Sequence, residues 1–147
     1  MNKEKLYISI ESDFTWGLLV KYTLKNKNKE ELSTLCVRED KLQSNFKNKK
    51  ALFLYNFITN EKYRNEGYGK YLLQRTLNIF KEKYDIMYLL ACPFYLTKEG
   101  QPIYETSNNG LNMNNLVQFY QKMGFTKYGE RKTEQNITFQ IMTINLK

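Results

Sequence analysis

The chain has 147 residues, a length that one domain can fill with a hydrophobic core without disulfides or structural metals. Hydrophobic residues make up 41% of the chain and aromatic residues 15%, which excludes a disordered polar chain. No apolar run approaches the roughly 20 residues of a membrane helix, and the polar first residues lack the apolar region of a signal peptide. We therefore expect one domain, residues 1–147, in the cytoplasm and without a membrane partner.

The sequence contains no histidine and two cysteines, Cys36 and Cys92. This excludes Ser/His and Cys/His catalytic pairs and predicts neither a zinc site nor a disulfide framework. Any catalysis must use tyrosine, carboxylates, backbone groups or a cofactor. The net charge of +8 favours anionic ligands, but many lysines lie in Lys/Asn-rich stretches typical of solvated loops, so nucleic acid is a secondary candidate partner.

The first half of the chain predicts an antiparallel meander. Residues 6–11 alternate apolar and polar side chains, and residues 17–24 and 31–37 predict two further strands joined by a Lys/Asn turn. Residues 15–24 also fit a helical spacing, so a helix there is an alternative. Residues 51–59 form a nearly continuous apolar run, the pattern of a central strand covered on both faces.

A helix and a second buried strand follow that apolar run. Leu73, Leu77, Phe80 and Tyr84 recur at the spacing of an amphipathic helix, and residues 86–91 form another apolar run. Strand, helix and strand in this order predict a βαβ unit with two parallel neighbouring strands.

The last third of the chain predicts a long loop, a short helix and two strands. Residues 93–110 contain both prolines and several turn residues, which is typical of a functional loop. A helix ends near Gly124, where a left-handed terminus favours glycine, and residues 126–131 and 137–146 predict a closing hairpin. The predicted fold class is therefore α/β (α+β mixed sheet), antiparallel at both ends, with a central parallel pair and helices on both faces.

Residues 64–70, with the sequence Arg-Asn-Glu-Gly-Tyr-Gly-Lys, lie between a buried strand and a helix. Helix amino termini present unpaired N–H groups and a positive dipole end, and glycines let an anion approach the backbone. The segment therefore predicts a pyrophosphate cradle, although a Gly-x-Gly turn alone is more often an ordinary loop. Leu72 and Tyr71 exclude a dinucleotide fingerprint and a P-loop, which need glycine and Ser or Thr at these positions.

The order of strand, Arg-x-x-Gly-x-Gly turn, helix, strand, long loop and a helix ending in Tyr-Gln-Lys-Met-Gly-Phe resembles the GNAT superfamily of N-acetyltransferases over about residues 52–125. The segment at residues 91–94 is similar to a GNAT subgroup common in bacterial and phage genomes. The resemblance implies that acetyl-CoA is the cosubstrate and that an amine attacks its thioester directly, with no metal. The residues that it assigns to the cofactor are Phe57, Ile58 and Thr59 of the strand and Arg64, Asn65, Glu66, Gly67, Tyr68, Gly69 and Lys70 of the turn.

The resemblance also assigns a catalytic residue. By periodicity alone Tyr120 would be a core residue with its hydroxyl at the rim, but the Tyr-x-x-x-Gly-Phe match implies that Tyr120 protonates the leaving thiolate of coenzyme A. Glu99, Tyr104 and Glu105 of the long loop are candidates to face the acceptor amine. Cys92 is expected to be a structural thiol rather than an acyl carrier.

The sequence departs from the family pattern in three places. Met113 replaces an asparagine often found seven residues before the catalytic tyrosine, so Asn114 is assigned only as a weak cofactor contact. The two helices usual between the first two strands have no counterpart, and Tyr55 and Asn56 stand where some members carry a carboxylate base.

Two other functions stay as alternatives. One is a non-catalytic acyl-CoA-binding module, because a fold does not fix a function. The other is an acetyltransferase that acts on an RNA-linked substrate such as aminoacyl-tRNA, which the net charge of +8 motivates.

Overall fold

The structure is a computed structural model of the chain, and it divides into two compact units. The first unit contains residues 1–87 and 145–147, and the second contains residues 88–144. The expectation of a single domain stays a prediction. The residues that the structure describes are 5–13, 18–40, 46, 48–99, 101–104, 112–135 and 137–147, with the backbone alone for residues 95, 96 and 102–104.

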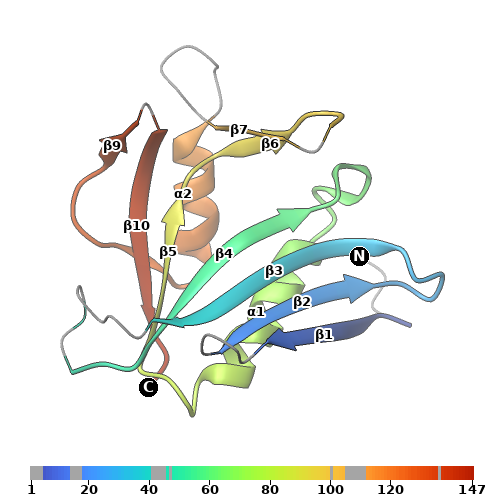
Figure 1. Cartoon of the computed structure of the whole chain (residues 1–147), viewed down its shortest axis with the longest axis horizontal. Helices are drawn as coiled ribbons and strands as arrows, with labels where there is room; N and C mark the ends of the chain where they lie inside the picture. Colours follow the sequence, from blue (N-terminus) through green and yellow to red (C-terminus); the bar gives the residue numbers. More distant parts are fainter. Residues whose placement is uncertain are drawn as a thin grey trace. The chain divides into compact units, whose positions relative to one another are not determined.

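The first unit opens with an antiparallel meander. Its strands are β1 (Tyr7–Asp13), β2 (Leu19–Lys25), β3 (Glu31–Asp40) and β4 (Ala51–Thr59), which pair in chain order (Figure 1). The predicted meander is confirmed. The alternative helix is wrong for the described residues 19–24, because they pair with β3 throughout and include the strand-favouring Val20, Tyr22 and Thr23.

The helix α1 (Tyr68–Phe80) packs on β2, β3 and β4. Leu72, Leu73 and Phe80 are buried on one face of the helix, and the Phe80 ring meets the Tyr22 ring of β2 edge-on with 6.1 Å between centroids. The predicted amphipathic helix is confirmed except at its end. Tyr84 lies beyond α1, although it is buried as expected, and its hydroxyl donates a hydrogen bond to Glu39 Oε2 at 3.0 Å.

The strand β5 (Ile86–Ala91) begins in the first unit beside β4. Where the two strands start, the backbone N–H groups of Asp85 and Ile86 donate to the Lys50 carbonyl at 2.8 and 3.4 Å. The two strands are parallel, so the predicted βαβ unit and the mixed sheet are confirmed.

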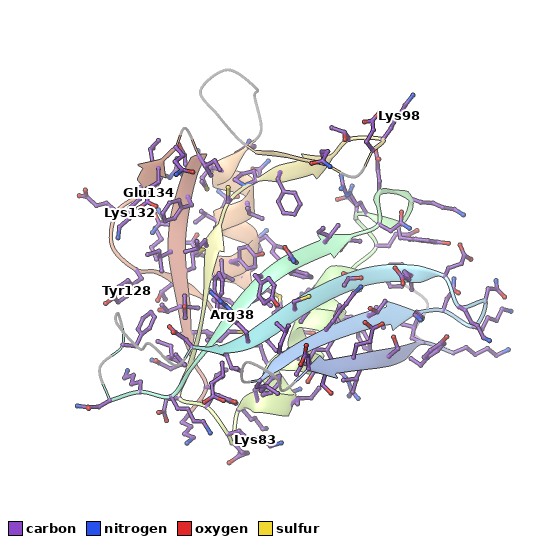
Figure 2. All side chains as sticks on the ribbon, viewed as in Figure 1. Arg38, Lys83, Lys98, Tyr128, Lys132 and Glu134 are labelled. Carbon is purple, nitrogen blue, oxygen red and sulfur yellow. The ribbon has the colours of Figure 1, made fainter. Side chains whose placement is uncertain are left out.

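In the second unit, β10 (Ile137–Asn145) lies between the rest of β5 and β8 (Thr126–Lys127). A short strand, β9 (Lys132–Glu134), also pairs with β10, and its Lys132 and Glu134 side chains are exposed (Figure 2). The predicted strand over residues 126–131 is therefore wrong beyond Lys127. Gly129 has a φ of 73°, a left-handed conformation that interrupts the extended chain there.

The predicted long loop over residues 93–110 contains regular structure. β6 (Phe94–Leu96) and β7 (Pro102–Tyr104) form an antiparallel hairpin in which Tyr95 pairs with Ile103. Residues 100 and 105–110 of the loop, including Glu105, lie outside the described residues.

The helix α2 (Met113–Lys122) has well-defined ends. Asn112 caps its amino terminus by accepting a hydrogen bond from the Asn115 N–H at 3.0 Å. At the other end Gly124 has a φ of 104°, as predicted, and a Cβ there would lie 3.1 Å from the Ile144 Cδ1 atom. This terminus directs Phe125 into the core, where it is almost completely buried.

Candidate functional site

The strand β4 contains a bulge before its carboxyl end. Thr34 lies opposite Ile58, whereas Cys36 lies opposite Tyr55, so the single residue Leu35 faces two residues of β4, Asn56 and Phe57. Asn56 has a φ of 51°, a left-handed conformation that asparagine tolerates better than most residues. A bulge bends its strand and interrupts the hydrogen-bond ladder, and this one lies where the sequence predicted that β4 meets the cofactor.

The connection from β4 to α1 ends in an open helix terminus. The 3₁₀-helix η1 (Glu61–Tyr63) follows β4, and Gly67 then acts as the amino-terminal cap of α1 without any side-chain hydrogen bond. The first helical bond runs from the Tyr71 N–H to the Gly67 carbonyl at 3.0 Å. The N–H groups of residues 68–70 precede it and therefore have no acceptor within the helix. This terminus has the geometry and dipole that bind a phosphate group.

The two positions of the turn that are occupied by glycine require it for different structural reasons. Gly67 is exposed and has a φ of 87°, so it provides a left-handed backbone. Gly69 is buried in the first turn of α1, and a Cβ on it would lie 2.7 Å from Thr59 Oγ1 and 3.4 Å from Phe57 Cζ. The sequence attributed both glycines to close approach of an anion. At Gly69 the structure adds a second reason for glycine, which is close packing of the helix on β4, and the predicted contact of Gly69 with the cofactor stays a prediction.

The Arg64 side chain reaches back to the last residue of β4. Its Nε donates a hydrogen bond to the Thr59 carbonyl at 3.3 Å, and the side chain is exposed. Arg64 therefore holds the turn to the strand, in addition to adding positive charge beside the helix terminus. Asn65, Glu66 and Lys70 are also exposed at the turn.

A polar cluster that the sequence did not predict joins the β2–β3 turn to η1. The Tyr63 hydroxyl donates a hydrogen bond to Glu30 Oε2, Asn26 Nδ2 donates to Glu30 Oε1 at 3.2 Å, and Lys62 Nζ lies 3.7 Å from Glu30 Oε2. The Tyr63 and Asn26 hydrogen bonds, and then the Lys62 charge, lower the pKa of the Glu30 carboxyl. The Tyr63 ring also meets the ring of Tyr68, the first residue of α1, edge-on at 6.1 Å.

This cluster fixes the segment that precedes the open helix terminus. Its key bond links Glu30 and Tyr63 across 33 residues, a pairing that no periodicity or local motif indicates. The available local signal was Asn26, whose side-chain oxygen accepts from the N–H groups of Asn28 and Glu30 at 2.9 and 3.1 Å and so shapes the turn.

Tyr120 is a buried residue of α2 with 7% of its surface exposed. Its ring meets the rings of Phe119 and Phe125 edge-on, at 5.3 and 5.7 Å. Burial raises the pKa of the Tyr120 hydroxyl, which keeps it protonated at neutral pH. This is the protonation state that a general acid needs, and the catalytic role of Tyr120 stays a prediction.

The other residues of the second unit that the sequence analysis singled out differ in how deeply they are buried. Asn114 is exposed, and its Oδ1 accepts a hydrogen bond from Arg131 Nη2. Met113 has 3% of its surface exposed, so the position where the family pattern has asparagine is a core position in this chain. Cys92 is half-buried and Glu99 is exposed, and their roles stay predictions.

Two further properties concern only the described part of the chain. Within it, no three His, Cys, Asp or Glu side chains come together in a group that would hold a metal ion. None of its helices is long and apolar enough to cross a bilayer.

Comparison with known proteins finds likeness in structure rather than in sequence. No protein-family model matches the sequence, and no curated protein matches it. The ribosomal-protein-S18-alanine N-acetyltransferase from Escherichia coli is similar to the chain with a TM-score of 0.59 and 12% identity, over 87% of this chain and 69% of the enzyme. An acetyltransferase of the GNAT family from Staphylococcus aureus Mu50 matches with a TM-score of 0.56 and 18% identity, over 88% of this chain and 68% of that protein.

A third similar structure is the spermidine/spermine N-acetyltransferase SpeG from Vibrio cholerae. It has a TM-score of 0.60 and 13% identity over 87% of this chain, which spans 65% of the length of that enzyme. The chain therefore has the fold of an N-acetyltransferase. More particularly, the fold is that of the GNAT superfamily, as the sequence resemblance implied.

Proposed function

We propose that the chain is an acetyl-CoA-dependent N-acetyltransferase. The observation that carries the proposal is the open amino terminus of α1 at Gly67, which follows a bulged strand within a GNAT fold. Phosphate groups bind where helix N–H groups lack acceptors, so the geometry of this turn fits the pyrophosphate of coenzyme A.

In the proposed complex the backbone N–H groups of residues 65–70 bind the pyrophosphate, and Arg64 and Lys70 add positive charge. The backbone of Phe57, Ile58 and Thr59 pairs with the pantetheine arm, as an added strand would. Asn114 contributes a weaker contact. The bulge supports this assignment because it displaces the β4 backbone from a regular ladder at these residues.

In the proposed reaction the acceptor amine attacks the thioester carbonyl carbon. The new N–C bond forms, the C–S bond breaks, and backbone N–H groups of β4 stabilise the negative oxygen between these events. Tyr120 gives its proton to the departing thiolate, while the amine loses a proton through water to a carboxylate of the 93–110 loop. An alkylamine has a pKa of about 10.4, so this proton removal is a real cost at neutral pH.

Calorimetric titration with acetyl-CoA tests the proposal. The wild type is expected to bind with a Kd on the order of micromolar. Gly67→Glu should abolish binding, because its carboxylate and bulk occupy the helix terminus. Gln74→Glu is the matched control, since it adds the same charge at an exposed position of α1 and should leave the Kd unchanged.

Two negative outcomes would lead to different conclusions about the function. A wild type that does not bind acetyl-CoA would contradict the transferase function. A wild type that binds acetyl-CoA but acetylates no amine would instead indicate an acyl-CoA-binding module. Tyr120→Phe would then have no effect on the binding of acetyl-CoA.

A further inference from the structure

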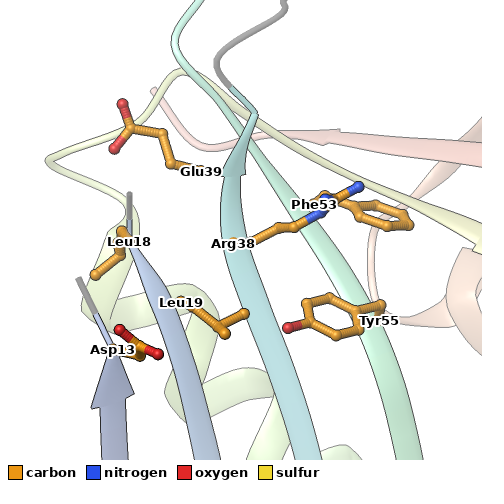
Figure 3. A pocket seen from close by; sticks show the side chains of 7 residues that line it. All are labelled: Asp13, Leu18, Leu19, Arg38, Glu39, Phe53 and Tyr55. Atoms are coloured by element: carbon orange, nitrogen blue, oxygen red, sulfur yellow. The ribbon is translucent and has the colours of Figure 1, made fainter. Parts of the chain in front are cut away.

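The first unit contains a cavity away from the turn at residues 64–70. Its volume is about 420 Å³, within the range of small-molecule sites, and it lies along β1 to β4 (Figure 3). Cross-strand pairing places Leu19 opposite Arg38 and Arg38 opposite Phe53, so side chains of three strands share one face of the sheet. Tyr22 is three residues from Leu19 and contacts α1, so this face is the one that α1 does not cover.

The cavity has an aromatic floor. The rings of Phe53 and Tyr55 are stacked, with 5.7 Å between centroids and 19° between planes. Leu19 borders them and has 39% of its surface exposed. Flat apolar groups pack favourably against such a surface.

The positive and negative side chains of the cavity lie at different distances from its aromatic rings. The Arg38 guanidinium lies 5.0 Å from the centre of the Phe53 ring, and its side chain is exposed. Glu39 points away from Arg38, Phe53 and Tyr55 (Figure 3). Its carboxylate accepts a hydrogen bond from the Tyr84 hydroxyl. Asp13 lies beyond Leu19, at the end of the cavity away from Phe53 (Figure 3). The aromatic floor is therefore bordered by a cation whose planar fork suits a carboxylate.

The floor of the cavity and the proposed cofactor segment belong to the same strand. Tyr55 immediately precedes the bulge, and Ile58 follows it. A strand rises about 3.3 Å per residue, so these residues lie roughly 10 Å apart along β4. An extended chain spans about 3.5 Å per residue, so two or three peptide units cover this separation.

We infer that this cavity binds the acceptor of the acetyl transfer, and that the acceptor is a short peptide with a free amino group, an apolar or aromatic side chain and a free carboxylate. The inference rests on the proposed function. Arg38 binds the carboxylate, Phe53 and Tyr55 pack against the side chain, and the amino group extends along β4 toward Phe57 and Ile58. A polyamine has no anion for Arg38 and is a poor acceptor.

Acetylation of matched peptides tests the inference. The substrates are Ala-Phe with a free carboxylate, the same dipeptide as its carboxyl-terminal amide, and spermidine. The free acid should have a kcat/KM about 10- to 100-fold above that of the amide, because a charge-assisted bidentate hydrogen bond is lost in the amide. Spermidine should be the poorest substrate. Equal rates for acid and amide, or a preference for spermidine, would overturn the inference.

The variant Arg38→Met should remove the preference for the free acid, mainly by raising the KM for the peptide. Arg38→Lys retains the charge without the fork and should have an intermediate KM. Arg75→Met is the control, because Arg75 is an exposed residue of α1 outside the cavity. Thermal melting of each variant shows whether it is folded. A folded Arg38→Met variant with the selectivity of Arg75→Met would contradict the role of Arg38.

A direct binding measurement separates this inference from the proposed function. Calorimetry with Ala-Phe and its amide, without acetyl-CoA, reports on the cavity even if the chain acetylates nothing. Binding of the acid that Arg38→Met weakens at least about tenfold would support the site. If acetyl-CoA binds but neither peptide does, the cofactor assignment stands and the acceptor inference fails.

Discussion

Gly69 lies so close to Thr59 that a Cβ on residue 69 would be 2.7 Å from the Thr59 hydroxyl oxygen. That hydroxyl cannot move freely, because it shares a 3.1 Å hydrogen bond with the Ser33 hydroxyl of β3. The first turn of α1, the last residue of β4 and the neighbouring strand β3 therefore form one tightly packed corner. The proposed pyrophosphate site is built on this corner.

Replacing Gly69 by alanine should push α1 away from β4. We expect a loss of about 1–3 kcal/mol of unfolding free energy, typical of overpacking, and a higher Kd for acetyl-CoA. Urea denaturation measures the first effect and calorimetry the second. The double variant Gly69→Ala with Thr59→Ala should recover part of the loss, because it removes the oxygen that the new methyl group meets. Purely additive effects in this double-mutant cycle would contradict the packing explanation.

Glu30→Gln and Tyr63→Phe should each loosen the segment before α1. Both residues are only half-buried, so we expect little change in the free energy of unfolding. The Kd for acetyl-CoA should be about two- to fivefold higher, since the turn is less preorganised. Calorimetric titration gives the Kd. Glu82→Gln, which changes the same charge at an exposed position after α1, should bind like the wild type. If Glu82→Gln and Glu30→Gln weaken binding equally, net charge rather than position explains the effect.

Tyr84 should make stability fall at alkaline pH. Burial, and then the hydrogen bond to Glu39, raise the pKa of Tyr84 from 10.0 to about 12. The folded chain thus favours the neutral phenol, so its contribution is complete below pH 10 and is lost as the pH rises through 12. Urea denaturation between these limits should show a shallower decline for Tyr84→Phe than for the wild type. Tyr128→Phe, at an exposed position, should parallel the wild type, and parallel curves for all three would refute the assignment.

Tyr120→Phe tests the proposed general acid. We expect kcat to fall about 100-fold or more while the Kd for acetyl-CoA stays within about twofold, because the hydroxyl is assigned to the chemical step. Steady-state kinetics with an acetylated amine, together with calorimetry, separate these quantities. The control is again Tyr128→Phe, which should retain full activity. An unchanged kcat in Tyr120→Phe would return Tyr120 to the role of a core aromatic residue.

The sequence predicted the limits of a strand best where consecutive residues are apolar and buried. Both parallel strands, residues 51–59 and 86–91, have their predicted limits, because long apolar runs bounded by polar residues leave little ambiguity. The hairpin within residues 93–104 was missed because its strands have three residues each, too few to establish a periodicity. The open terminus at Gly67 followed from its place between strand and helix.

Other features of the site depend on contacts between distant residues. The bond between Glu30 and Tyr63 joins a turn to a 3₁₀-helix, and a single sequence contains no local signal for it. The position of Gly69 against Thr59 likewise depends on how closely α1 approaches β4. The sequence could thus predict that the turn binds an anion, but it could not predict the contacts that hold the turn in place.

The extra residue in β4 also reverses the alternation of its side chains. Before the bulge, Leu54 shares the α1 face with Val37 and Tyr22 by cross-strand pairing. After it, odd-numbered residues take that face, since Phe57 and Thr59 approach Gly69. Ile58 consequently joins Tyr55 on the opposite face. If the same residues paired with β3 without a bulge, Thr59 would turn away from the helix. Deleting Asn56 instead would leave Phe57 opposite Leu35 and keep Thr59 facing α1.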